Sequence, residues 1–322
     1  MRVMEITPEI KEKIEKLNEK YAALGQDLNA YLEGLLYADT VKYWDYIAVD
    51  TLLSLQKPRT SLPDEVIFII YHQITELYFK LALREFDQLA EKETLTGDFF
   101  VDRVGRINRY FEALTKSFEI MVQGMEKDQF LKFRMSLLPA SGFQSAQYRL
   151  IEIASTDFIN LVHKDKREPF KPSDNIQEMY KNIYWKTGAT ELATGKKTLT
   201  LKEFEARYSD EFILYGEQMR EKNLWQLYNS LSEEDQKRED VIKAMKQNDV
   251  NVNINWPLVH YKSAVRYLQK DPSDIAATGG TNWQKYLPPR FQKRIFYPAL
   301  WSDQEKSEWG RAWVEEVIGT LK

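Results

Sequence analysis

Apolar residues recur at helical spacing over much of this chain, and runs that alternate apolar and polar residues are scarce. A spacing of three and four residues places apolar side chains on one face of a helix, whereas strands require a period of two. Apolar residues stand at positions i, i+3, i+4 and i+7 in four ranges: 8–23, 64–91, 105–123 and 257–268. The sequence therefore predicts an all-α fold.

The longest predicted helix runs from Pro63 to about Ala90. Ser61 is suited to cap it, proline is favoured in a first helical turn, and Asp64 lies near the positive end of the helix dipole. The stretch EVIFIIYHQITELYFKL within it is apolar nearly all round. We therefore expect this helix to be buried.

The remainder of the chain suggests a simple organisation. Residues 165–200 mix Pro, Gly, Lys and Thr without lasting periodicity, which indicates a long connection with a short helix. Helical patterning returns over 201–250 with many charges, as is typical of solvated helices. We expect residues 1–40 to form an N-terminal helical segment and 41–322 one large helical domain, with 165–250 as a connection and peripheral helical insertion.

Composition narrows the classes of function. The 322 residues include 45 basic and 49 acidic side chains, so the overall charge does not favour binding of nucleic acid or of an anionic membrane. There is no cysteine, which excludes disulfides, thiolate nucleophiles and thiolate metal sites. The N-terminus lacks the apolar stretch of a secretory signal, and no run reaches transmembrane length. We expect a cytoplasmic protein, with long helices lined by its 18 Tyr, 16 Phe and 8 Trp.

The three histidines are the leading candidates for metal ligands or general bases in a chain without cysteine. His72 shares a helical face with Phe68, Glu76 and Lys80. It is either a satisfied core histidine in a Glu–Lys network or, together with Glu76, part of a metal site, although no HExxH motif completes such a site. His163 precedes a charge run and fits a surface position or one behind the site.

His260 follows Pro257, a residue suited to a first helical turn, and shares a face with Ala264 and Leu268. A small residue one turn beyond a histidine leaves room for a flat group such as haem. An ordinary helical core has the same requirement. The pattern leaves both interpretations open.

Two turns rich in small and polar residues accompany these helices. Arg134 precedes PASGFQSAQYR, and a guanidinium beside such a turn can fix a carboxylate by two contacts, although an exposed arginine before a Pro-containing helix break is the commoner case. The stretch ATGGTNW at 277–283 is either a flexible turn or a loop whose Thr278 and Thr281 approach a small ligand; the absence of GxxxxGK and of a preceding strand argues against a nucleotide. These features together indicate a pocket for a small aromatic acid, without specifying a reaction.

Several motifs in one order resemble the tryptophan 2,3-dioxygenase family. They are FIIYHQITELYFKL at 68–81, FRMSLLPASGFQSAQYRLIE at 133–152, and His260 with Arg266 followed by TGGT at 278–281. YWDYIAVDTLLSLQKP at 43–58 is also similar to the family pattern YxxYLxLDxLLxxQxP. The resemblance covers roughly 40–160 and 255–300. It implies a large helical single-core domain around haem b, ferrous for activity, that uses dioxygen to cleave the indole C2–C3 bond of L-tryptophan, giving N-formylkynurenine in the kynurenine pathway.

The resemblance also implies roles for individual residues. His260 corresponds to the proximal iron ligand, and His72 to the catalytic distal histidine that bonds the indole N–H and orients the ring. Arg134 corresponds to the group that grips the substrate carboxylate, and Thr278 to the one that meets the amino-acid head group. Other positions correspond to the indole pocket (Phe68 and Phe130, where some members have Tyr), the haem edge (Ser141, Gly142) and the pocket of a neighbouring subunit in a homotetramer (Tyr43, Tyr46, Ile47).

The Gly loop departs from the family pattern. The family usually has GTGGSSG where this chain has ATGGTNW, and about four extra residues around KDPSD lengthen the link from His260 to Thr278. These differences in the loop bear on which substrate is bound more than on which cofactor is used or which reaction is catalysed. The alternatives are a related haem enzyme that mono-oxygenates a modified tryptophan or another indole and, less favoured because His260 and Arg134 are present, a non-catalytic haem sensor or helical interaction protein.

Overall fold

The computed structural model describes residues 6–137, 144–189, 196–268 and 293–310. These residues form helices joined by turns and loops, with no strand among them, so the predicted all-α fold is confirmed. The chain divides into two compact units, residues 1–55 and residues 56–322, each described by itself below.

The first unit buries almost none of its side chains. It contains α1 (Pro8–Ala23), which coincides with the predicted range 8–23, and three shorter helices: α2 (Leu28–Tyr37), α3 (Tyr43–Tyr46) and α4 (Val49–Leu53). Leu28 is the only buried residue among those described in this unit, while Leu36 is 83% exposed. Apolar surface of this extent is normally covered in a stable protein.

The longest helix, α5 (Asp64–Ala90), begins one residue after the predicted start. The prediction that Ser61 caps it is wrong, because Pro63 is the cap residue, and the Asp64 N–H donates to Gln129 Oε1 at 3.3 Å. Instead, the Glu65 carboxylate accepts hydrogen bonds from the backbone N–H groups of Arg59 (2.8 Å) and Thr60 (2.7 Å). These bonds hold the preceding turn against the helix start and lower the pKa of Glu65.

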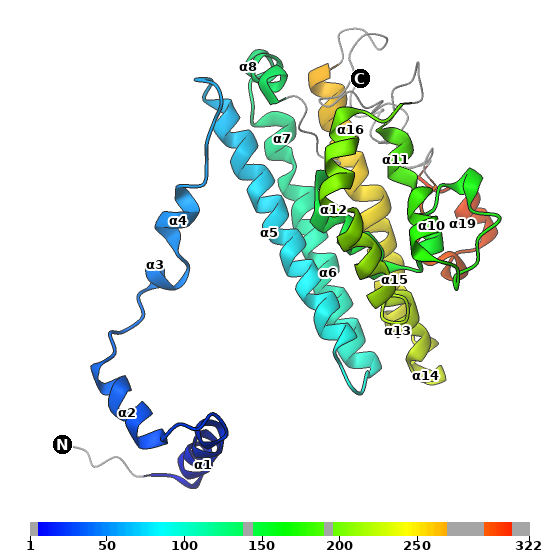
Figure 1. Cartoon of the computed structure of the whole chain (residues 1–322). Coiled ribbons are helices and arrows are strands. Elements are labelled where there is room, and N and C mark those ends of the chain that lie inside the picture. Colours follow the sequence, from blue (N-terminus) through cyan, green and yellow to red (C-terminus); the bar gives the residue numbers. More distant parts are fainter. Residues whose placement is uncertain (1–5, 138–143, 190–195, 269–292, 311–322) are drawn as a thin grey trace. The chain divides into compact units, whose positions relative to one another are not determined.

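Helices α5 and α6 (Gly97–Ser117) lie side by side in the second unit and pack closely against each other (Figure 1). The Tyr71 hydroxyl donates to the Leu114 carbonyl oxygen at 3.1 Å across their contact. On α6 the fully buried residues repeat at intervals of three and four, which explains the amphipathic pattern of its sequence: Phe100, Val104, Ile107, Phe111 and Leu114.

Three more helices complete this core. Helix α15 (Glu239–Val250) packs on α6, where the Asn108 side chain donates to the Ala244 carbonyl oxygen at 2.9 Å. Helix α9 (Ala146–Ser155) packs on α5, and α12 (Leu199–Gln218) packs on α9. Although its sequence is strongly charged, α15 buries Val241 and Met245, so it belongs to the core.

The expectation that α5 is buried all round is wrong for one face. The side chains of Ile70, Ile74, Leu77 and Leu81 are between 37% and 50% exposed. Length and composition make α5 the one helix among the described residues that could cross a membrane, contrary to our expectation that no run suffices. Core helices of soluble proteins pass the same test, so this does not establish a membrane span.

Two predicted ranges contain more helices than expected. The range 105–123 holds the end of α6 and all of α7 (Glu119–Gln123), because α6 already begins at Gly97, where Thr96 caps it. The connection 165–200 contains the end of a 3₁₀ turn η4 (Lys164–Lys166), two short helices instead of one, and the start of α12. The short helices are α10 (Ile176–Lys181) and α11 (Tyr184–Gly188). Two more, α13 (Leu224–Ser230) and α14 (Glu233–Gln236), follow α12.

Hydrogen bonds to Asp249 hold the segment 294–301 against the end of α15. Its buried carboxylate accepts hydrogen bonds from the Phe296 N–H (3.0 Å), the Tyr297 N–H (3.2 Å), Trp301 Nε1 (3.0 Å) and Asn253 Nδ2 (2.6 Å). Burial raises the pKa of Asp249 to about 6, against the effect of these donors. The π-helix η5 (Asn251–Asn255) follows directly and leads into α16 (Trp256–Leu268).

Replacing Asp249 by asparagine is expected to lower the free energy of unfolding by at least about 2 kcal/mol, because an amide nitrogen facing buried N–H groups leaves donors without an acceptor. Urea unfolding of the purified protein measures this. The matched control is Asp303→Asn at a fully exposed position, which should leave the transition nearly unchanged. Equal stability of the two variants would show that Asp249 does not hold this segment.

Candidate active site

Two histidines distant in sequence come close together in the fold. His72 lies on α5 and His260 on α16. Burial is the main cause that lowers the pKa of His260 to about 4, and the charge of a protonated His72 lowers it further. The two imidazoles therefore lie within electrostatic reach of each other, and His260 is neutral at neutral pH.

His260 has the geometry of a metal-binding imidazole. Its Nδ1 lies 2.9 Å from the Trp256 carbonyl oxygen, and because that oxygen can only accept, Nδ1 carries the proton. Nε2 is therefore the unprotonated nitrogen, with a lone pair for a ligand bond. The rings of Phe118 (4.4 Å between centroids) and Trp256 (4.3 Å) enclose the imidazole in apolar surroundings.

His72 has the same tautomer. Its Nδ1 donates to the Phe68 carbonyl oxygen at 2.7 Å, and the Phe68 ring lies 4.1 Å from the imidazole. Burial lowers the pKa of His72, so the ring is neutral although it remains accessible to solvent. Its Nε2 can accept a hydrogen bond from a ligand. No third His, Asp or Glu joins His72 and Glu76 within the described residues.

Gln147 ties the start of α9 to α5, one turn beyond His72. Its Nε2 donates at 2.8 Å to both the backbone carbonyl oxygen and the carboxylate of Glu76. Gln147 comes from the polar stretch PASGFQSAQYR, in which Ser145 caps α9. At least two polar residues of that stretch thus position helices beside the histidines.

Arg134 lies in the short 3₁₀ turn η1 (Arg134–Leu137), directly after α8 (Lys127–Phe133), and is 8% exposed. Burial lowers the pKa of this guanidinium. The Phe68 ring lies 5.7 Å from that of Phe133 and 6.2 Å from that of Phe130. The rings of Phe130 and Phe133 thus lie near that of Phe68, which contacts His72, and Arg134 directly follows Phe133 in the chain.

Ser141, Gly142 and Thr278 lie outside the described residues. Tyr43, Tyr46 and Ile47 belong to the first unit, where their exposed fractions are 73%, 82% and 39%. His163 is partly buried, and its Nδ1 accepts from the Asp165 N–H at 3.3 Å.

The sequence did not identify Phe118, Trp256 and Gln147 as site residues. Trp256 stands four residues before His260, and in a helix this spacing lets the imidazole bond the Trp256 carbonyl oxygen. The sequence therefore contained the information needed to find Trp256. Phe118 and Gln147 act through contacts between different helices, which spacing does not reveal.

Fold and site define an all-helical protein with two neutral imidazoles packed against aromatic rings, each with its Nε2 left for a ligand. Residues 35–256 match the family model for tryptophan 2,3-dioxygenase, and the chain belongs to that family. His72 and Arg134 lie inside the matched range, whereas His260 and Thr278 lie beyond it.

Individual relatives agree with this assignment. The tryptophan 2,3-dioxygenase of Ruegeria sp. is 40% identical over 118 residues, covering 36% of this chain and 42% of that protein. Tryptophan 2,3-dioxygenase 2 of Ralstonia nicotianae is 43% identical over 124 residues, covering 35% and 33%. The chain thus spans about two fifths of the first relative and a third of the second.

A third relative, tryptophan 2,3-dioxygenase of Pseudomonas fluorescens, is 27% identical over 281 residues, covering 83% of this chain and 91% of that protein. All three relatives carry the same name. They do not favour the alternative of a mono-oxygenase acting on another indole.

Proposed function

We propose that this protein is a haem-dependent dioxygenase of the kynurenine pathway that cleaves the indole C2–C3 bond of L-tryptophan, giving N-formylkynurenine. The observation that carries the proposal is the pair of neutral histidines, His72 and His260, each with Nδ1 bonded to a backbone carbonyl and Nε2 left for a ligand. Family membership supports the same reaction.

The cofactor of the proposal is haem b, whose iron His260 would bind. The neutral, apolar-enclosed imidazole fits this role, because an unprotonated Nε2 and a carbonyl-bonded Nδ1 are the usual features of a metal-ligating histidine. Ser141 and Gly142 are proposed to lie near the haem edge. When bound, ferrous haem supplies the activation of dioxygen.

The protein itself would bind and orient the amino acid. Arg134 would hold the substrate carboxylate and Thr278 its head group, while Phe68 and Phe130 form walls of the indole pocket. Nε2 of His72 would accept the indole N–H and fix the ring orientation. Fixing the carboxylate at one end and the indole N–H at the other aligns the C2–C3 bond for reaction and excludes water from the pocket.

The proposed assembly is a homotetramer in which Tyr43, Tyr46 and Ile47 contribute to the pocket of a neighbouring subunit. Two observations support self-association. The first unit leaves most of its large apolar side chains exposed, and α5 carries an exposed row of aliphatic side chains. Within the proposal the protein is cytoplasmic and binds neither nucleic acid nor membrane.

Changing Leu77 and Leu81 together to glutamate is expected to lower the number of subunits per particle, because charges on that row oppose its burial against another copy. Light scattering coupled to gel filtration measures the mass. Lys80→Glu is the matched control, since it changes the charge of the same helix beside that row. An unchanged mass for the double variant would exclude α5 from the subunit interface.

Turnover of the haem-loaded, reduced protein tests the proposed substrate. L-Tryptophan and oxygen should yield N-formylkynurenine, identified by its absorbance and its mass, whereas indole without the amino-acid group should react much more slowly because Arg134 has no carboxylate to hold. A normal haem spectrum with no conversion of L-tryptophan would overturn the proposed substrate.

A further inference from the structure

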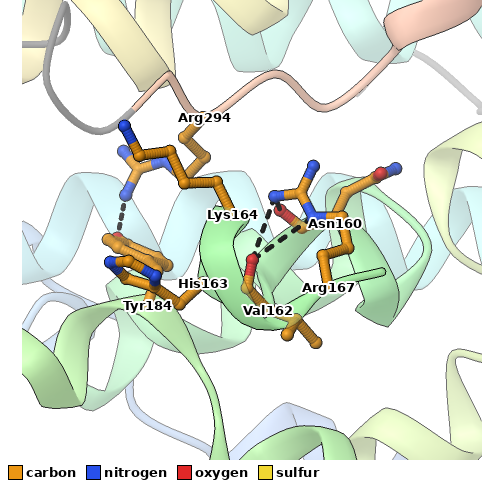
Figure 2. Close-up of a pocket in the computed structure, with 7 residues that line it drawn as sticks. All are labelled: Asn160, Val162, His163, Lys164, Arg167, Tyr184 and Arg294. Carbon is orange, nitrogen blue, oxygen red and sulfur yellow. Dashed lines mark hydrogen bonds between the residues drawn. The ribbon is translucent and has the colours of Figure 1, made fainter. Parts of the chain in front are cut away.

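A small cavity of about 40 Å³ lies apart from the histidine pair, beside the 3₁₀ turn η4 and the first turn of α11. Figure 2 shows Arg167 on one side of it and Arg294 with Tyr184 on the other. None of the lining residues is acidic, and three are cations: the lining comprises Asn160, Val162, His163, Lys164, Arg167, Tyr184 and Arg294.

Arg167 faces this cavity with a positive charge that lacks a carboxylate partner within the described residues. Its Nη2 donates to the backbone carbonyl oxygens of Asn160 (2.9 Å) and Val162 (3.0 Å), and its Nε also donates to Val162. These bonds orient the guanidinium without neutralising it. Burial is the cause that lowers the pKa of Arg167.

Arg294 adds to the positive charge instead of cancelling it. It pairs with Glu152 at 2.6 Å, but the same carboxylate also pairs with Arg149 at 2.8 Å, so two guanidinium groups share one buried anion. Tyr184 donates to Glu152 as well and accepts from Arg149 at 2.9 Å. A partly buried excess of positive charge is costly unless an anion offsets it.

Two further donors complete the lining. Lys164 makes no ion pair with any described residue, and its ammonium can donate three hydrogen bonds. His163 accepts from the Asp165 N–H through Nδ1, so its Nε2 carries the proton of the neutral ring and can donate. Within the described part of the chain, the carboxylate of Asp165 lies near His163, with its Oδ2 3.8 Å from the ring nitrogen Nδ1.

We propose that this cavity binds a small tetrahedral oxyanion, either inorganic phosphate or the phosphate group of a monoester. The donors left for an anion are the N–H groups of Arg167 Nη1, the Lys164 ammonium and the His163 Nε2–H, because the Nε and Nη2 hydrogens of Arg167 already bond backbone carbonyls. Three donors of different geometry suit a tetrahedral anion better than a planar carboxylate. The site is distinct from the Arg134 neighbourhood and binds its anion whatever the reaction at the histidines.

Thermal unfolding of the full chain tests the proposal. Millimolar sodium phosphate should raise Tm by about 2 °C or more over sodium chloride of equal ionic strength, because a ligand that binds only the folded state stabilises it. Sodium acetate should have no such effect. Glycerol 2-phosphate distinguishes the two sources: an equal rise assigns the cavity to monoesters, and a rise with inorganic phosphate alone assigns it to the free ion.

Matched variants locate the site. Lys164→Ala should weaken phosphate binding, measured by calorimetry, about tenfold. Lys166→Ala removes the same charge from the same turn but does not line the cavity, and Arg134→Ala removes the other candidate anion group, so both should bind phosphate normally. Equal Tm values in phosphate and chloride, or equal losses for Lys164→Ala and Lys166→Ala, would overturn the proposal.

Discussion

His260→Ala protein is expected to lose stable haem binding and, with it, dioxygenase activity. The imidazole of His260 is the one proposed bond between the chain and the iron, and its Nε2 is left unprotonated because Nδ1 donates to the Trp256 carbonyl oxygen. The measurement is the Soret absorbance and haem content of protein reconstituted with haem and passed through a desalting column.

Two controls separate loss of the ligand from loss of the fold. His163→Ala removes a histidine whose ring nitrogen Nδ1 accepts from the Asp165 N–H, and it should leave haem content unchanged. Added imidazole should partly restore the haem spectrum of His260→Ala, since a free imidazole can occupy the space of the missing ring. Full haem retention by His260→Ala would exclude His260 as the axial ligand.

Arg134→Ala is expected to raise KM for L-tryptophan by roughly thirtyfold or more while leaving the haem spectrum intact. Loss of one partner of a buried, charge-assisted contact costs about 2–5 kcal/mol, and each 1.4 kcal/mol is about tenfold in affinity. Arg134 is 8% exposed, so little water is available to replace it as a partner for the carboxylate.

A substrate analogue without the carboxylate is the matched control for Arg134→Ala. Tryptamine lacks the carboxylate, so it should bind the unaltered protein weakly. Arg134→Ala should bind tryptamine with the same affinity as the unaltered protein does. The four affinities form a double-mutant cycle that isolates the contact between Arg134 and the carboxylate. Arg106→Ala, which removes a more exposed arginine paired with Asp102, should not change KM. Unaltered affinity of Arg134→Ala for L-tryptophan would show that the carboxylate is held elsewhere.

The sequence predicted individual helices closely where local chemistry determines them. The range 8–23 matches α1, and the start of α5 was placed within one residue because proline and aspartate favour a first helical turn. The helix that carries His260 was also placed within one residue. Periodicity and first-turn preferences are local properties, so one chain suffices to read them.

Properties that depend on other parts of the molecule were not predictable in this way. The pattern of α5 is apolar all round, and it gives no indication that Ile70, Ile74, Leu77 and Leu81 face outward from a single chain. The contact of Gln147 with Glu76 joins two helices, and no periodic signal pairs them. The proximity of His72 and His260 is likewise a product of packing; from sequence it followed only from the family resemblance.

The most direct test of the central claim is the mass of the product formed from L-tryptophan by the reduced, haem-loaded protein under oxygen-18 gas. Cleavage of the indole C2–C3 bond by a dioxygenase predicts two labelled oxygen atoms in N-formylkynurenine. Gain of a single labelled atom would contradict the account and identify the protein as a mono-oxygenase.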